Sequence, residues 1–163
     1  MKIHIENMNI TLSHHQPPAG LLAALAITNA SRPTPKEGVP AIGEKWPGLD
    51  AVYVGTALSQ NEDRLVHLIL WPSYEKEGMD YEKAVKWAES VNPDMNSHIP
   101  TRHQSITLFE RVRDQIDTDY WYWTPTKTAG GNAAFGQYFV SGSQDNCNLS
   151  WEGRVRAVSE IPL

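Results

Sequence analysis

The segment Leu-Val-His-Leu-Ile-Leu at residues 65–70 constrains the fold most, because its apolar side chains follow one another with little alternation. A strand with one face in water alternates apolar and polar residues, so this run predicts a strand that is buried on both faces. Residues 51–57 also have the pattern of a strand, and residues 61–63 have the composition of a turn. We therefore predict a hairpin from these two strands, with His67 as a histidine of the core.

Two helices are predicted after the hairpin. Asp80 stands where an N-cap is expected, and residues 81–88 carry apolar side chains at the spacing of one helical face. Thr101 is followed three positions later by Gln104, which is the pattern of a capping box at the start of a helix. The apolar face of this second helix predicts that it ends near Asp117.

Three further strands are predicted in the last third of the chain, at residues 120–124, 134–140 and 154–158. Between them, residues 127–132 and 141–152 are rich in Gly, Asn, Ser and Asp, so we expect loops at the ends of these strands. The combination of strands and helices predicts a mixed α+β fold.

The first 48 residues form a different region. Residues 1–13 alternate like a strand with a break, Pro17 opens an apolar helix, and residues 31–48 are rich in proline. We therefore divide the chain into an N-terminal strand, apolar helix and Pro-rich connection at 1–48, and a main domain at 49–163. The apolar helix is expected to be buried or to pack against a partner, so a homo-oligomer is one possibility.

Charge and composition bound the classes of partner and compartment. The chain has 163 residues and a net charge of −5, from 14 Lys and Arg against 19 Asp and Glu. Generic nucleic-acid binding relies on a basic surface, so we do not expect it. The longest apolar run, residues 21–27, is far shorter than the roughly 20 residues that span a bilayer, so we expect no membrane association. One cysteine allows no internal disulfide, which favours a cytoplasmic or virion setting.

The side chains that carry chemistry are each expected to have a structural or solvated role. Cys147 has no positive charge beside it to lower its pKa, so we predict an ordinary thiol. His98 and His103 stand on either side of a helix start at a spacing that does not suit a metal pair, and both are expected at the surface or in a cap. Calcium would suit the oxygen atoms of residues 145–152, but Asn-rich turns are commonly turns alone. We therefore predict no catalytic residue, no metal and no cofactor.

The order of short motifs in residues 51–161 resembles a known superfamily. The motifs are Ala84-Val85-x-x-Ala88, Pro100-Thr101-Arg102, Tyr120-Trp121-x-x-Thr124 and Arg154-Val155-Arg156-Ala157-Val158. In this order they resemble the C-type-lectin-like fold, in particular the domain of unknown function at the C-terminus of bacterial collagen-like adhesins. The sequence is more distantly similar to formylglycine-generating enzymes and to phage receptor-binding proteins diversified by retroelements. It departs from the family at Ser97-His98, where Trp-Arg is usual, and at Tyr122-Trp123, where Ser-Ser is usual.

The resemblance implies two main helices around a small twisted antiparallel sheet, with residues 1–48 as an N-terminal strand–helix elaboration. Formylglycine-generating enzymes use a cysteine pair, and this chain has a single cysteine. We therefore expect a non-enzymatic protein, encoded by phage or prophage, that recognises a protein partner in host takeover, anti-defence or receptor binding. The alternatives are a degenerate or metal-dependent enzyme of the formylglycine-generating superfamily, and a structural oligomer or virion component.

The predicted recognition surface combines polar loops with aromatic residues. Residues that alternate along the aromatic strand should place one pair of rings in the core and the other pair outside. Gly- and Asn-rich loops offer adaptable hydrogen bonds beside such rigid rings. The predicted binding residues are Tyr120, Trp121, Tyr122, Trp123, Gly130, Gly131, Asn132, Gln144, Asp145, Asn146 and Asn148. Joint substitution of Asn132, Gln144 and Asn146 is expected to spare stability and to weaken partner capture.

Overall fold

The structure is a computed structural model that describes residues 38–163. By its internal contacts the chain divides into two units, Met1–Thr34 and Pro35–Leu163. The strand and the apolar helix expected before residue 38 lie outside the described residues. Gly43 and Glu44 exchange backbone hydrogen bonds with Tyr53, so the end of the Pro-rich connection pairs with the first strand of the larger unit.

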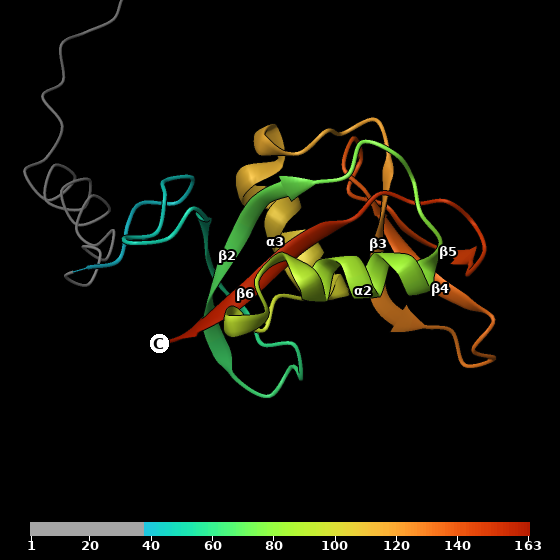
Figure 1. The fold of residues 1–163 in the computed structure, drawn as a ribbon, viewed down its shortest axis with the longest axis horizontal. Coiled ribbons are helices and arrows are strands. Elements are labelled where there is room, and N and C mark those ends of the chain that lie inside the picture. Colours follow the sequence, from blue (N-terminus) through green and yellow to red (C-terminus); the bar gives the residue numbers. More distant parts are fainter. Residues whose placement is uncertain (1–37) are drawn as a thin grey trace, which may run out of the picture. The chain divides into compact units, whose positions relative to one another are not determined.

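Three antiparallel strands form the first sheet, in the order β1 (Val52–Leu58), β2 (Leu65–Tyr74) and β6 (Arg156–Pro162), as Figure 1 shows for β2 and β6. β2 is the middle strand, and its residues 66–70 are all buried. This burial confirms the strand that the sequence predicts to be covered on both faces. The hairpin of β1 and β2 is confirmed as well.

A small aromatic cluster packs against β1 and β2 of the first sheet. Trp46, Tyr53 and His67 have ring centroids 5.3 to 5.5 Å apart. The Tyr53 hydroxyl and His67 Nδ1 lie 2.9 Å apart in a buried hydrogen bond. The prediction that His67 is a satisfied histidine of the core is therefore confirmed.

The two predicted helices are α2 (Tyr81–Val91) and α3 (Arg102–Val112), and the 3-10 turn η1 (Pro93–Met95) lies between them. Both caps are confirmed. The Asp80 carboxylate accepts a hydrogen bond from the Lys83 amide, and Thr101 and Gln104 form the reciprocal capping box. α3 ends before the predicted boundary near Asp117, at the point where the chain tightens into the 3-10 turn η2 (Arg113–Gln115).

A second antiparallel sheet contains β3 (Trp121–Lys127), β4 (Ala133–Tyr138) and β5 (Gln144–Asn148), in that order. The expected single sheet is therefore corrected to two small sheets. The expectation of a loop at residues 144–148 is also wrong. β5 is an edge strand whose side chains are mostly exposed and polar, so its composition resembles that of a loop. Its pairing with β4 makes it a strand, and composition does not reveal that pairing.

α2 and α3 pack on opposite faces of the first sheet (Figure 1). Ile69 belongs to the apolar cluster that contains the buried alanines of α2, whereas Leu68 and Leu70 belong to the cluster that contains the buried residues of α3. Because neighbouring residues of a strand point to opposite faces, the two helices cover opposite sides of β2. β3 joins both clusters, since Tyr122 packs with the α3 cluster and Trp123 with the α2 cluster.

Candidate functional site

The aromatic run at the start of β3 divides into an exposed and a buried half. Tyr120 is 42% exposed and Trp121 is half-buried, whereas Tyr122 and Trp123 are 5% and 0% exposed. The prediction that alternate rings of the run face outward and inward is wrong, because the two buried rings are consecutive. Apolar clusters cover both faces of β3, so two consecutive rings are buried on opposite sides. Tyr122 and Trp123 therefore build the core and present no surface to a partner.

The Gly-rich residues form the tip of the β3–β4 hairpin. Gly130, Gly131 and Asn132 are exposed, and the positive φ of Gly131 (+70°) closes the turn with a hydrogen bond to Thr128. Asn148 at the end of β5 pairs with Ala133 and so lies beside this tip. The structure brings these predicted residues together at one end of the second sheet.

Gln144 lies at the other end of the second sheet and links it to α3. Its amide nitrogen donates to the Arg102 carbonyl at 2.9 Å and to Gln137 Oε1 at 2.8 Å, and its amide oxygen accepts from Arg102 Nε at 2.7 Å. The Arg102 guanidinium also lies 4.0 Å from the ring centroid of Phe135. Every polar atom of the Gln144 side chain is thus engaged within the fold, which is the arrangement of a structural residue.

The predicted binding residues therefore do not form one surface. Trp121 pairs with Tyr138 at one end of the hairpin, and Lys127 pairs with Ala134 beside the tip at the other. Six residues of strand separate these positions, which corresponds to about 20 Å. Asp145 and Asn146 are exposed on the edge strand between the two ends.

A cluster of partly exposed rings surrounds the start of β3. We call Tyr120, Trp121, Tyr138, Trp151 and Arg154 the aromatic patch. Within the patch the rings of Trp121 and Tyr138 stack with centroids 5.2 Å apart and planes 17° apart, and the Arg154 guanidinium lies 4.0 Å from the centroid of Tyr120. Trp151 is 37% exposed and packs edge-on against buried Trp123 at 5.3 Å. A shallow pocket of about 160 Å³ lies between Tyr120, Trp121, Trp151 and Arg154.

Sequence reasoning found only part of this patch. The sequence predicts Tyr138 in a strand and Trp151 in a polar loop. The signal for Tyr138 was its place across a hairpin from the aromatic run, because directly opposed residues of antiparallel strands share a face. Trp151 gave no comparable signal, since its position depends on Gly153, where a Cβ atom would lie 2.5 Å from the Trp151 ring.

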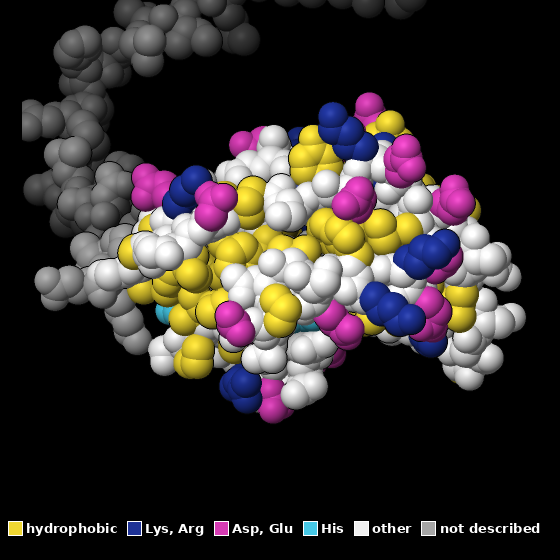
Figure 2. Space-filling model, in the orientation of Figure 1, with side chains coloured by type: hydrophobic (Ala, Val, Ile, Leu, Met, Phe, Trp, Pro, Cys, Tyr) yellow, Lys and Arg dark blue, Asp and Glu magenta, His cyan; other side chains and the backbone are white. Residues whose placement is uncertain are grey.

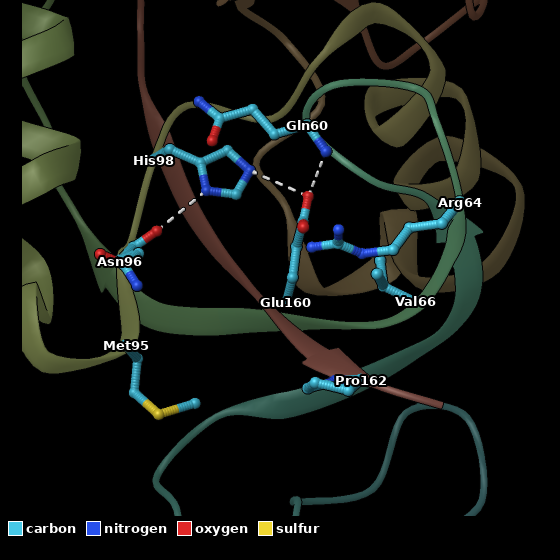
Figure 3. A pocket seen from close by; sticks show the side chains of 8 residues that line it. All are labelled: Gln60, Arg64, Val66, Met95, Asn96, His98, Glu160 and Pro162. Atoms are coloured by element: carbon cyan, nitrogen blue, oxygen red, sulfur yellow. Dashed lines mark hydrogen bonds and ion pairs between the residues drawn. The ribbon is translucent and has the colours of Figure 1, made fainter.

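A second pocket, of about 150 Å³, surrounds His98 and is drawn in Figure 3. Gln60, Arg64, Asn96 and Glu160 contribute its polar lining. His98 is only 7% exposed, so of the two places expected for it, the surface or a cap, the surface is wrong. The residue is covered because its backbone pairs with Val158 of β6 and its ring lies beside Gln104 and Glu160.

Both ring nitrogens of His98 face oxygen acceptors. Nδ1 lies 3.1 Å from the Asn96 carbonyl oxygen, and Nε2 lies 3.2 Å from Gln104 Oε1 and 3.8 Å from Glu160 Oε1. The orientation of the Gln104 amide is fixed, because its nitrogen donates to Glu160 and to the Leu58 carbonyl.

The His98 pocket is a structural junction more than a reactive centre. The Glu160 carboxylate also accepts a hydrogen bond from the backbone N–H of Gln60. One carboxylate oxygen is therefore bound both by the β1–β2 turn and by Gln104 of α3. Cys147 lies in the second sheet, where burial raises the pKa of its thiol and favours the unreactive form. Among residues 38–163 no three His, Cys, Asp or Glu side chains converge in a way that could hold a metal ion.

The visible face in Figure 2 carries acidic and basic side chains intermixed, without a continuous patch of one sign on the described residues. No helix in the described part of the chain is both long and apolar enough to cross a bilayer. No protein-family model matches the sequence, and no curated protein matches it either.

Proposed function

We propose that this chain is a non-enzymatic binding protein that recognises a protein partner through the aromatic patch. The proposal includes a C-type-lectin-like frame and a phage or prophage origin, with a role in host takeover, anti-defence or receptor binding in the host cytoplasm or on the virion. The mixed α+β architecture supports the C-type-lectin-like frame, because the last strand, β6, pairs with β2, the second strand of the described residues. Two helices and a second, loop-connected sheet lie between these paired strands in the sequence.

The aromatic patch is the observation that carries the proposal. Tryptophan, tyrosine and arginine are the residues most enriched where binding energy concentrates in protein interfaces. The stacked pair of Trp121 and Tyr138 and the contact of Arg154 with Tyr120 hold these side chains in place before any partner arrives. A partner that docks there therefore loses little side-chain entropy from this chain, which favours affinity.

The test compares the patch with the polar residues of the same sheet. We expect the full chain, immobilised and exposed to host lysate, to retain a protein that a Tyr120→Ser/Trp151→Ser variant releases. The matched control is Asn132→Ala/Asn146→Ala, which also alters two exposed side chains of this region. With the captured protein purified, the patch variant should bind about 30-fold or more weakly, since interface anchors commonly contribute 2 kcal/mol or more.

Two outcomes would contradict the proposal. Equal affinity of wild type and the patch variant for the captured protein would remove the patch from recognition. Loss of binding in the Asn132→Ala/Asn146→Ala variant alone would place recognition at the hairpin tip and the β5 edge. Both variants need melting temperatures close to that of the wild type, because Trp151 also contacts the buried ring of Trp123.

A further inference from the structure

Arg156 is a buried arginine without an acidic partner among the described residues. It is 6% exposed, and it lies where the pairing of β2 with β6 becomes irregular, opposite Tyr74. Its guanidinium donates one hydrogen bond, from Nη2 to the Trp71 carbonyl at 3.0 Å. Its Nε is buried and has no hydrogen-bond partner among the described residues. The guanidinium carbon lies 5.8 Å from the ring centroid of Tyr74.

This arrangement is costly for the protein alone. A buried charge destabilises a fold unless an opposite charge and a full set of hydrogen bonds compensate it. Burial lowers the pKa of the Arg156 guanidinium, opposed only by the hydroxyls of Tyr122 and Tyr74. An arginine side chain nevertheless stays protonated in a protein. The fold therefore holds a cation that calls for an anionic group from elsewhere.

Arg156 lines a pocket of about 310 Å³. Tyr74, Ile116 and Tyr122 give it walls with apolar area, and the exposed residues Asp114 and Asp117 line its outer part. The Tyr122 hydroxyl donates to the Asp117 carbonyl at 2.8 Å and so fixes the loop that carries both acids. Neither of these two carboxylates forms an ion pair with any residue in the described range.

We propose that this pocket binds a small zwitterion that carries a carboxylate and an ammonium group, of which an apolar α-amino acid is the simplest case. The ligand carboxylate accepts hydrogen bonds from the Arg156 guanidinium, the charge-assisted pairing that arginine geometry favours. The ligand ammonium lies toward Asp117 and Asp114, and its apolar side chain lies against Tyr74 and Ile116. This site is separate from the protein-binding surface proposed above and does not depend on it.

The two charge signs in the pocket select this class of ligand over a simple anion. A phosphate or another multivalent anion would gain the contact with Arg156 but would approach the carboxylates of Asp114 and Asp117. A cation alone would leave the buried guanidinium without a partner. A zwitterion satisfies the inner cation and the outer acids at once, and the volume admits a molecule the size of leucine.

The first experiment measures binding of L-leucine to the full chain by isothermal titration calorimetry, with two analogues that each lack one charge. N-acetyl-L-leucine keeps the carboxylate but has no ammonium group, and L-leucinamide keeps the ammonium but has no carboxylate. We expect leucine to bind and each analogue to bind about tenfold or more weakly, because each loses a charge-assisted hydrogen bond. Absence of any binding at millimolar leucine, or equal binding of all three compounds, would overturn the proposal.

The second experiment assigns the two charges to residues. Arg156→Met keeps an unbranched apolar side chain without the guanidinium and should abolish leucine binding, while Arg154→Met, in the aromatic patch, should leave it unchanged. Asp117→Asn alters only an exposed side chain, so its folding is not in question. It should weaken leucine binding severalfold and leave N-acetyl-leucine binding unaffected. Wild-type affinity for leucine in Asp117→Asn and in a folded Arg156→Met protein would overturn the assignment.

Discussion

The two ends of the β3–β4 hairpin differ in how firmly their side chains are held. At the tip, Gly130, Gly131 and Asn132 are exposed, and the turn is closed by backbone hydrogen bonds. At the opposite end, the rings of Trp121 and Tyr138 stack on each other and Arg154 covers Tyr120. Both ends have the residue types of a recognition surface, but only the aromatic end is preorganised.

This difference shows that a loop can have the polar composition of a recognition surface without having side chains that are held in place. Gly and Asn are favoured in turns for conformational reasons, because they adopt positive φ at low cost. Rings that are fixed by their neighbours offer large contact area at little entropic cost. The comparison also separates residues that stabilise the sheet from residues that only lie on its surface. Mutations can test both groups.

The largest contrast lies within the aromatic run itself. Trp123→Ala should destabilise the protein by about 3–5 kcal/mol, because it removes a fully buried ring and leaves a cavity. Trp121→Ala, two residues earlier on the strand, should cost about 1 kcal/mol, chiefly the stacking with Tyr138. Urea denaturation followed by circular dichroism measures both values. Similar costs for the two variants would mean that the division into a buried and an exposed half is wrong.

A smaller contrast distinguishes the amides of the second sheet. Gln144→Ala should cost about 1–3 kcal/mol, because Arg102 Nε loses its acceptor and the buried Gln137 Oε1 loses its donor. Asn132→Ala should change the free energy of unfolding by less than about 0.5 kcal/mol, as exposed substitutions usually do. The sequence-based expectation that joint substitution of Asn132, Gln144 and Asn146 would spare stability is therefore corrected for Gln144. A neutral Gln144→Ala would show that its three hydrogen bonds are not maintained in solution.

The parts of this fold that the sequence predicts are those in which the cause is local. Thr101 and Gln104 are three residues apart, so their capping box is visible in any reading of the chain. The buried strand at residues 66–70 is likewise visible, because every position in it is apolar except His67. In both cases the structure depends on residues that are neighbours in the sequence.

The parts that the sequence does not predict depend on distant partners. Residues 144–148 form a strand only because β4 lies beside them. His98 is buried because its backbone pairs with Val158 of β6 and Gln104 closes over its ring. Arg156 has no acidic partner among the described residues because none of their carboxylates lies beside it in the fold. No local sequence pattern predicts this arrangement. The place of Trp151 in the aromatic patch is likewise not visible in the sequence, since Trp151 lies in a loop.

The cap of α3 allows stability to be lowered without touching either end of the hairpin. Thr101→Ala should cost about 1 kcal/mol, because the backbone N–H of Gln104 loses its acceptor at the start of the helix. Partner capture by the aromatic patch should persist at temperatures where the variant is folded. Thr101→Ser retains the hydroxyl and serves as the control, with a cost close to zero. Loss of partner capture in folded Thr101→Ala protein would indicate that the patch depends on α3 and is not independently held.

The last prediction concerns a pH dependence at Tyr122, the first buried ring next to the exposed half of the aromatic run. Burial raises the pKa of its hydroxyl to about 12, with a smaller contribution from Asp117. The free hydroxyl titrates near pH 10, so folding favours the neutral form, and this stabilisation is fully present below about pH 10. It is lost as the pH rises from about 10 toward 12, because the unfolded chain releases its proton first.

Tyr122→Phe removes the titrating group along with the hydrogen bond to the Asp117 carbonyl. Near neutral pH the variant should therefore be less stable than the wild type by about 1 kcal/mol. Between pH 10 and 12 the wild type should lose stability faster than the variant, so the difference between them shrinks. Thr101→Ala is the control, because it removes no titrating group and its difference from the wild type should stay constant over this range. A constant difference for Tyr122→Phe as well would show that the ring is solvated, and that the boundary between the buried and exposed halves of the run lies after Tyr122.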